Sequence, residues 1–475
     1  MIRAVETQCT RPACRFFKWR LAGAVVSLAR QTSVDQLREY EVNQKLNKKL
    51  FLVAMLLAVK SAYAASGDAS IEVYGVLDVG FAHASNALSA SSQFSSGISS
   101  VNAKTANAGV SGLSNGEVAP SRIGFKGTED VGNGWKTIFD LETGFNLPYG
   151  TYSNGVGSVA ANTKSSITTN NADSSTAGQL FNRQAYVGLA SEQYGTVTLG
   201  RNYSLGYDTM MAYDPLDGAQ LFSPIGYSGS YAGGGLTEDF RIDDSVKYKY
   251  RYQNVNAGVL YKFGGQAGST SAQSEAQATL GYDNGTFGIQ ATYSEVKDGL
   301  SAGNSNTLGT VSLTVANTQS AMLAASYKID QFRLRGGYQR QTFKNPSHPA
   351  LDATITTVLG YSVTGAVNTT AYTNEKKLDV YFVGVTYDFA KNVSASVAYY
   401  DVKQNDYSGG TCTGGSSLAS CSGNNKFFSA LAFYKLSKRT QLYAGFMKNK
   451  VDGGFASGFV NDTNNTVGLG IKHMF

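Results

Sequence analysis

The chain has 475 residues, of which 53 are Gly, 29 Tyr, 24 Phe and only 7 Pro, and its formal net charge is +6. Abundant aromatic and small residues are typical of β structure, and a mean hydropathy of −0.19 argues against a bundle of membrane helices. The longest apolar run, residues 50–59, is too short for a spanning helix, which requires about 20 residues.

This apolar run belongs to a secretory signal peptide that we expect in residues 42–64. Three lysines precede the run, and the small residues of "SAYA" follow it at the spacing of a cleavage site. The mature chain, residues 65–475, then begins at about Ala65. Residues 1–41 form an N-terminal extension with two possible origins: a misplaced start site, with the true start near Val42, or an atypical long leader.

Removing the leader changes the charge and the cysteine count. Residues 1–64 hold 11 of the 40 Lys and Arg and 4 of the 34 Asp and Glu, so the remaining chain has a net charge near −1. The basic excess belongs to the leader, and we expect no nucleic acid as a partner. Only Cys412 and Cys421 remain, in a Gly- and Ser-rich stretch of an exported chain. We expect a disulfide between them, with two free thiols as the alternative.

Alternation of apolar and polar residues predicts strands along the whole mature chain. In the first, residues 71–83, Val73, Leu77 and Phe81 fall on one face, whereas Glu72 and Asp78 fall on the other. The pattern recurs until sixteen strands are counted, among them "SRIGFKG", "WKTIFDLETGF", "SVKYKYRY", "FRLRGGYQR", "VSASVAYY" and the C-terminal "TVGLGIKHMF".

The connections between these strands predict the topology. Seven short connections alternate with eight long ones, near residues 84–119, 146–180, 201–244, 265–274, 298–317, 345–374, 406–424 and 453–463. Strict alternation places all tight turns and both chain ends at one end of an antiparallel up-and-down barrel. A cylinder of sixteen strands is too wide for side chains to fill, so the polar face lines an aqueous lumen and the apolar face meets lipid. Because every backbone group within hydrocarbon must be paired, the last strand pairs with the first.

Two soluble alternatives are a β-propeller and a secreted β-sandwich adhesin. We find no blade-length repeat, and a sandwich rarely alternates long and short connections so regularly. An enzyme is the other class to consider. The mature chain holds only His83, His348 and His473, and none accompanies a G-x-S-x-G or a zinc-spaced set of ligands. We therefore expect no catalytic activity, no cofactor and no metal.

Four stretches resemble the general trimeric porins of the Gram-negative outer membrane, in the β-proteobacterial branch. They are "EVYGVLDVGF", "SRIGFKGTEDVGNGWKTIFDLETGFN", "FNRQAYVGLASEQYGTVTLGRNY" and "VGLGIKHMF", and they follow the order and spacing of that family. The resemblance implies a homotrimer in the cell outer membrane that passes ions and small hydrophilic solutes. It also implies contacts with outer-membrane lipid, lipopolysaccharide and the outer-membrane insertion machinery, and it makes the terminal Phe475 an assembly signal.

The resemblance implies that the third long loop, about residues 201–244, folds into the lumen. There it forms a constriction that selects solutes by size and charge. We expect acidic loop residues to face basic residues of the wall across the pore. The candidate acids are Asp208, Asp214, Asp217, Glu238 and Asp239, and the candidate bases are Arg122, Lys126, Arg183, Lys247 and Lys249.

Some of these assignments carry open questions. Arg183 shares the parity of the outward Val187 and Leu189, so an inward position requires a bulge or a place beyond the lipid band. Lys247 stands where Arg is usual in the family. A lysine ammonium is a point charge and not a planar fork, so a fixed geometry of the ion pairs at the constriction stays an open point. The basic wall favours anions. Three tyrosines of the third loop, Tyr203, Tyr207 and Tyr213, leave a substrate-specific channel as the alternative.

Overall fold

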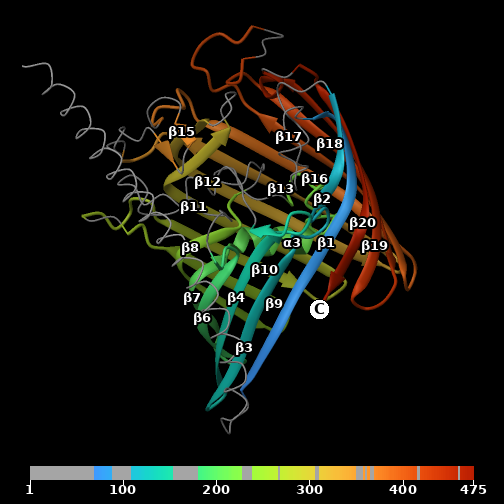
Figure 1. The fold of residues 1–475 in the computed structure, drawn as a ribbon. Helices are drawn as coiled ribbons and strands as arrows, with labels where there is room; N and C mark the ends of the chain where they lie inside the picture. The colour runs from blue at the N-terminus through green and yellow to red at the C-terminus, as the bar shows by residue number, and fades with distance from the viewer. Residues whose placement is uncertain are drawn as a thin grey trace, which may run out of the picture. The chain divides into compact units, whose positions relative to one another are not determined.

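The computed structural model describes residues 69–87, 108–152, 180–226, 238–265, 268–304, 310–348, 357–358, 361–363, 368–413, 418–457 and 460–475. The expected signal peptide and N-terminal extension lie outside these residues and stay predictions. Residues 70–475 form one compact unit, and within it the described strands make a closed antiparallel β-barrel (Figure 1). No helix in the described ranges is long and apolar enough to cross a membrane.

The barrel wall has sixteen strands, as the sequence predicts. They are β1 (Ser70–Ala87), β3 (Arg122–Gly132), β4 (Trp135–Asn146), β6 (Gln184–Ser191), β7 (Gly195–Tyr203), β8 (Arg241–Tyr252), β9 (Val255–Lys262), β10 (Glu275–Asp283), β11 (Phe287–Asn304), β12 (Thr310–Ile329), β13 (Phe332–Lys344), β16 (Lys376–Ala390), β17 (Val393–Gln404), β18 (Gly423–Lys435), β19 (Thr440–Gly453) and β20 (Thr463–Met474). Each pairs with the next in antiparallel register.

The smaller elements lie in the long connections. They are the strands β2 (Ala108–Asn115), β5 (Thr151–Tyr152), β14 (Thr357–Val358) and β15 (Tyr361–Val363), the helix α3 (Leu205–Tyr213) and the 3-10 turn η2 (Gly454–Ala456). The strand β2 is not predicted from the sequence, because residues 84–119 lack a clear alternation and are expected to form a loop. In the structure β2 pairs with the end of β1 that β3 leaves free.

The two ends of the chain close the barrel. Residues 76–84 of β1 pair with residues 466–474 of β20, beginning with Val76 opposite Met474. Beyond the last strand residue, the Phe475 N–H donates to the Gly75 carbonyl at 3.1 Å, and the Gly75 N–H donates to the Phe475 carbonyl at 3.0 Å. The predicted pairing of the first and last strands is confirmed, and it leaves the barrel without an open edge.

Burial follows an inside-out pattern along the strands. In β10 the polar Glu275, Gln277 and Thr279 are buried, while the alternating Leu280 and Tyr282 are exposed. The exposed face is apolar in the other wall strands too, with Val73, Val187, Leu199, Val259, Leu323, Val383 and Leu469 among its members. A soluble barrel would bury this face. Its exposure is the arrangement expected of a barrel whose outer solvent is lipid.

Two further findings differ from what the sequence predicts. The third long connection is shorter than residues 201–244, because β7 and β8 continue their ladder past a bulge and pair Asn202 with Ile242 and Tyr203 with Arg241. We call residues 204–240 loop 3, of which 204–226 and 238–240 are described. The inward face is also less polar than expected, since β16 and β18 bury Val380, Phe382 and Leu431 against the apolar side chains of loop 3.

Candidate functional site: the lumen crossed by loop 3

Loop 3 begins with the helix α3, which the wall strands β8, β10 and β11 hold by polar contacts. Ser204 caps the helix, its hydroxyl accepting from the Tyr207 N–H at 2.9 Å. Inside the helix, the Thr209 hydroxyl shares a hydrogen bond of 2.7 Å with that of Thr292 on β11. A Ser at this position satisfies an otherwise unpaired amide of the first turn. The helix therefore starts at once after β7 and packs against the neighbouring wall.

The far part of loop 3 is fixed to the opposite wall. Asp214 is fully buried and accepts from the Tyr400 hydroxyl of β17 at 2.6 Å and from the Gly218 N–H at 2.7 Å. Farther on, the Ser429 hydroxyl of β18 donates to the Phe222 carbonyl at 2.7 Å. Because loop 3 starts at β7 and contacts β17 and β18, its backbone crosses the interior of the barrel.

Apolar packing adds to these anchors. Met210, Leu216, Leu221, Phe222 and Ile225 of loop 3 are buried in one cluster with inward side chains of β16 to β19. Burial of side chains of this size contributes about 1.5–3 kcal/mol each. Loop 3 is thus part of the barrel's core on that side, and its other side borders water.

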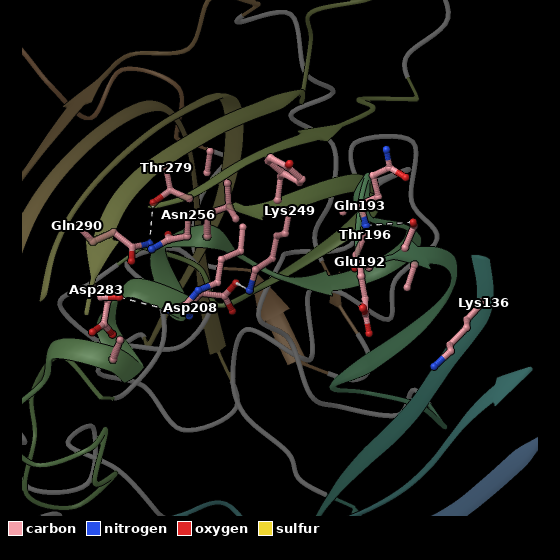
Figure 2. Close-up of a pocket in the computed structure, with 18 of the residues that line it drawn as sticks. Lys136, Glu192, Gln193, Thr196, Asp208, Lys249, Asn256, Thr279, Asp283 and Gln290 are labelled. Atoms are coloured by element: carbon pink, nitrogen blue, oxygen red, sulfur yellow. Dashed lines mark hydrogen bonds and ion pairs between the residues drawn. The ribbon is translucent and has the colours of Figure 1, made fainter. Parts of the chain in front are cut away.

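The sequence-predicted bases Lys247 and Lys249 lie together on β8 and share one acid. The Nζ atoms of both lysines lie 2.8 Å from the Asp208 carboxylate of α3. Figure 2 shows the Lys249 and Asp208 side chains meeting at a cavity of about 910 Å³, which Lys136, Arg251 and Glu192 also line. Burial acts to raise the pKa of Asp208, but the two ammonium groups outweigh it and hold that pKa below its usual range. The acid and the bases are therefore in direct contact here, not opposed across the lumen.

A second basic group surrounds Glu142 of β4. The Nε atoms of Arg122 and Arg183 lie 3.1 Å and 2.6 Å from its two carboxylate oxygens. The Tyr203 hydroxyl also donates to Glu142, at 2.7 Å. Arg183 precedes β6, so its side chain reaches Glu142 without a bulge and is only 3 % exposed. Lys126 stands nearer to water, 48 % exposed, in an ion pair with Glu72.

The remaining predicted acids of loop 3 lie in different surroundings. Asp217 is 55 % exposed and lies 2.5 Å from Arg335 of β13. Asp214, Glu238 and Asp239 are buried. Burial raises the pKa of Glu238 to about 6, although its carboxylate accepts from the Ser294 hydroxyl. Asp208 and Asp217 contact wall cations, Lys247 and Lys249 in the first case and Arg335 in the second.

Sequence reasoning missed two anchors of loop 3, Arg335 and Tyr400. Arg335 has inward parity in "FRLRGGYQR", because Phe332 and Leu334 occupy the outward face. That parity could have marked it as a lumen base. Nothing in the sequence marks Tyr400, because pairing it with Asp214 requires knowledge of where loop 3 runs. The two cysteines of the connection after β17, Cys412 and Cys421, are joined by a disulfide, with Cα atoms 5.7 Å apart.

A buried carboxyl beside the β1–β20 seam gives a testable pH dependence. Glu117 is fully buried, and its backbone carbonyl accepts from the Leu221 N–H of loop 3 at 2.8 Å. Burial, reinforced by Asp78, raises the pKa of Glu117 from 4.5 to about 9. The folded state thus binds a proton that the unfolded state releases, and this group lowers stability as pH rises from about 4.5 toward 9.

We expect Glu117→Gln to be more stable than the wild type at pH 8, by on the order of 2 kcal/mol, because the amide folds without taking up a proton. Urea unfolding of the protein in lipid vesicles at pH 5 and pH 8 measures this effect. The stability difference between the two pH values should shrink in the variant. An unchanged difference would show that Glu117 is not the group responsible.

The fold and the lumen define a class of protein: a membrane-spanning β-barrel whose interior holds an ordered loop and a charged, water-accessible surface. The family model of the Gram-negative porins matches residues 52–454, and the chain belongs to this family. It is an outer-membrane protein that forms a diffusion channel.

Individual relatives agree with this assignment. The chain is 30 % identical to an outer membrane porin protein of Bordetella pertussis over 455 residues, which cover 90 % of this chain and 100 % of that one. Its fold is similar to an anion-selective porin from Comamonas acidovorans, at a TM-score of 0.56 and 18 % identity, covering 86 % of this chain and 100 % of that one. It is also similar to the trimer form of OmpT from Vibrio cholerae, at a TM-score of 0.51 and 15 % identity, covering 86 % and 99 %.

Proposed function

We propose that this channel is a general diffusion porin that prefers anions. The observation that carries the proposal is the sign of the charges that water can reach in the lumen. Lys249 and Lys126 are 55 % and 48 % exposed and Arg122 is partly exposed, each in an ion pair, whereas of the five predicted acids of loop 3 Asp217 alone is exposed to a similar extent. A lumen lined by one sign of charge concentrates ions of the other sign. A solved structure of similar fold is named as an anion-selective porin, which agrees with this preference.

Loop 3 is the proposed constriction. It narrows the lumen because it occupies the side next to β16 to β19, and the path for solutes then runs past β3, β4 and β8. Small hydrophilic solutes pass down their gradients, and the charged pairs around Asp208 and Glu142 select among them by field and size. Asp217 and Arg335 form the corresponding pair on the other side of the loop.

The channel is proposed to work without catalysis, cofactor or metal, because diffusion requires only a path. A substrate-specific channel is the second candidate, and it would need an extended aromatic or basic ladder along the lumen. Tyr203 and Tyr207 instead stack on each other at 4.3 Å, and the Tyr203 hydroxyl donates to Glu142. These rings serve packing of the wall, which favours the general porin.

The proposed assembly is a homotrimer embedded in outer-membrane lipid and lipopolysaccharide. The trimer form of a protein with a similar fold supports it. Planar-bilayer recordings test the pore and the assembly together. Insertion of one particle should give a step of conductance that closes at high voltage in three equal sub-steps. Closure in a single step would contradict the trimer, and absence of conductance would contradict the pore.

The terminal Phe475 is proposed to serve the insertion machinery as well as the fold. Its backbone extends the pairing with β1, and its ring lies against Gly75. Deleting Phe475 should therefore reduce the amount of protein that reaches the outer membrane several-fold, while the pores that form keep their conductance. Outer-membrane fractions and single-channel recordings measure the two effects. Equal amounts of protein in the outer membrane with and without Phe475 would show that this residue is not a signal for the insertion machinery.

A further inference from the structure

The methionines in the described part of the barrel differ in how much water can reach them. Three of them, Met210, Met322 and Met447, are 1 %, 4 % and 0 % exposed. The other two, Met211 and Met474, are 37 % and 38 % exposed. Peroxides oxidise a methionine thioether to a sulfoxide, and burial shields the sulfur from an oxidant dissolved in water. Among the described methionines, two are therefore open to such an oxidant.

One of these two methionines lies at the constriction. Met211 is in the last turn of α3, inside the barrel, so the water that reaches it is the water of the lumen. Met210 is buried in the cluster with the wall, whereas Ala212 lines the cavity shown in Figure 2. Met474 lies instead at the mouth, where its N–H donates to the Arg439 carbonyl of a tight turn at 2.8 Å. A solute that crosses the barrel therefore passes Met211 beside loop 3.

The Met211 sulfur is seated on the turn that follows α3. A Cβ added to Gly218 would lie 2.6 Å from the Met211 Sδ atom, so the sulfur rests against the backbone of Gly218. Gly218 has a φ of +69° and donates its N–H to the Asp214 carboxylate at 2.7 Å. On its other side, a Cβ added to Gly226 would lie 2.6 Å from the Gly218 carbonyl carbon. Because Gly218 is enclosed on both sides, the turn has no room for a larger group at the sulfur.

We propose that Met211 is an oxidation site at which peroxides that enter the lumen modify loop 3, an inference that rests on the barrel being a water-filled channel. Hydrogen peroxide is a small hydrophilic solute of the kind that such a channel passes. A lone pair of the Met211 sulfur attacks one peroxide oxygen, and the O–O bond breaks as the S–O bond forms. The sulfur is oxidised by two electrons, and the peroxide is reduced by two. The proton of the transferred oxygen moves to the departing hydroxide, which leaves as water.

The sulfoxide changes the constriction because it converts an apolar side chain into a polar one. Its oxygen does not fit between the sulfur and the backbone of Gly218, so the side chain leaves this seat and turns toward the water of the lumen. There it occupies part of the path of the ions, and the conductance falls. The sulfoxide carries no net charge, so the preference of the pore for one sign of ion stays the same.

The test compares the full-length, refolded wild type with Met211→Leu and with the matched control Met474→Leu. Each variant removes one of the two exposed thioethers, and Leu replaces Met with little change of volume, so both variants should fold. Conductance and zero-current potential are recorded in planar bilayers before and after addition of hydrogen peroxide. Fragmentation mass spectrometry of the treated protein measures the oxidised fraction at each methionine.

Met211 and Met474 should gain one oxygen about tenfold faster than the three buried methionines. The conductance of the wild type and of Met474→Leu should fall by about a tenth to a third at unchanged zero-current potential, while Met211→Leu keeps its conductance. Oxidation of Met211 no faster than that of Met210, an unchanged wild-type conductance, or equal falls in all three proteins would overturn the proposal.

A variant that does not fold leaves the test decisive. In Met474→Leu the remaining exposed thioether is that of Met211, so its conductance must fall in step with oxidation of Met211. A fall that precedes this oxidation would contradict the proposal. Normal conductance that peroxide does not change refutes the oxidation site alone, whereas absence of conductance before peroxide is added refutes the channel itself.

Discussion

Replacing Lys126 and Lys249 with Gln is expected to lower the ratio of anion to cation permeability by about two- to threefold. These two ammonium groups are the most exposed of the predicted wall bases. The zero-current potential in a planar bilayer under a salt gradient measures the ratio. The shift should shrink at high ionic strength, because salt screens exposed charges over about 10 Å at 0.1 M.

Asp208→Asn is the matched variant: it removes a negative charge from the same cluster and should shift the selectivity in the opposite direction. In the wild type this carboxylate neutralises part of the charge of Lys247 and Lys249, and its lowered pKa keeps it ionised throughout the neutral range. The amide leaves both ammonium groups uncompensated, so anion preference should rise. If both changes move the zero-current potential in the same direction, the charges of this cluster do not set the selectivity.

Replacing Asp214 with Ala is expected to loosen loop 3 and to raise both the conductance and the current noise of the open pore. The change leaves the Tyr400 hydroxyl and the Gly218 N–H without the acceptor that now lies at 2.6 Å and 2.7 Å from them. Each buried polar group left unpaired costs about 1–3 kcal/mol. Single-channel recordings at fixed voltage and salt measure both effects.

Asp214→Asn separates the anchor from the charge. It keeps one oxygen that can accept from Tyr400 but places its NH2 beside the Gly218 N–H, so its current noise should lie between those of the wild type and the Ala variant. Tyr400→Phe, which removes the donor, should resemble the Ala variant in a milder form. Asp217→Asn should instead raise anion preference without noise, since its side chain is exposed and anchors less of the loop. Equal noise in the Asn and Ala variants of Asp214 would mean that its charge, not its hydrogen bonds, holds loop 3.

The barrel could be predicted almost completely from the sequence, because strand parity is a local signal. Val73, Leu77 and Phe81 alternate with Glu72 and Asp78, and this spacing alone assigns the faces of β1. The closure of β1 with β20 followed from the requirement that no backbone edge stays unpaired in lipid.

The details of the lumen could not be predicted in the same way. Whether an acid of loop 3 faces water or is buried depends on the path of the loop through space, and the sequence contains no periodic signal for that path. Asp208 and Asp214 have the same charge and lie six positions apart, yet one contacts wall lysines and the other is enclosed with Tyr400. The apolar inward face of β16 and β18 has the same cause, because loop 3 covers it.

The zero-current potential of the wild-type protein tests the central claim most directly. The purified protein is inserted into a neutral-lipid bilayer between two concentrations of KCl, and the voltage at which no current flows is recorded. We expect a stable conductance and a zero-current potential whose sign shows that chloride passes faster than potassium. A zero-current potential of the opposite sign, which would show faster passage of potassium, or the absence of any conductance would contradict the assignment of this barrel as an anion-preferring diffusion pore.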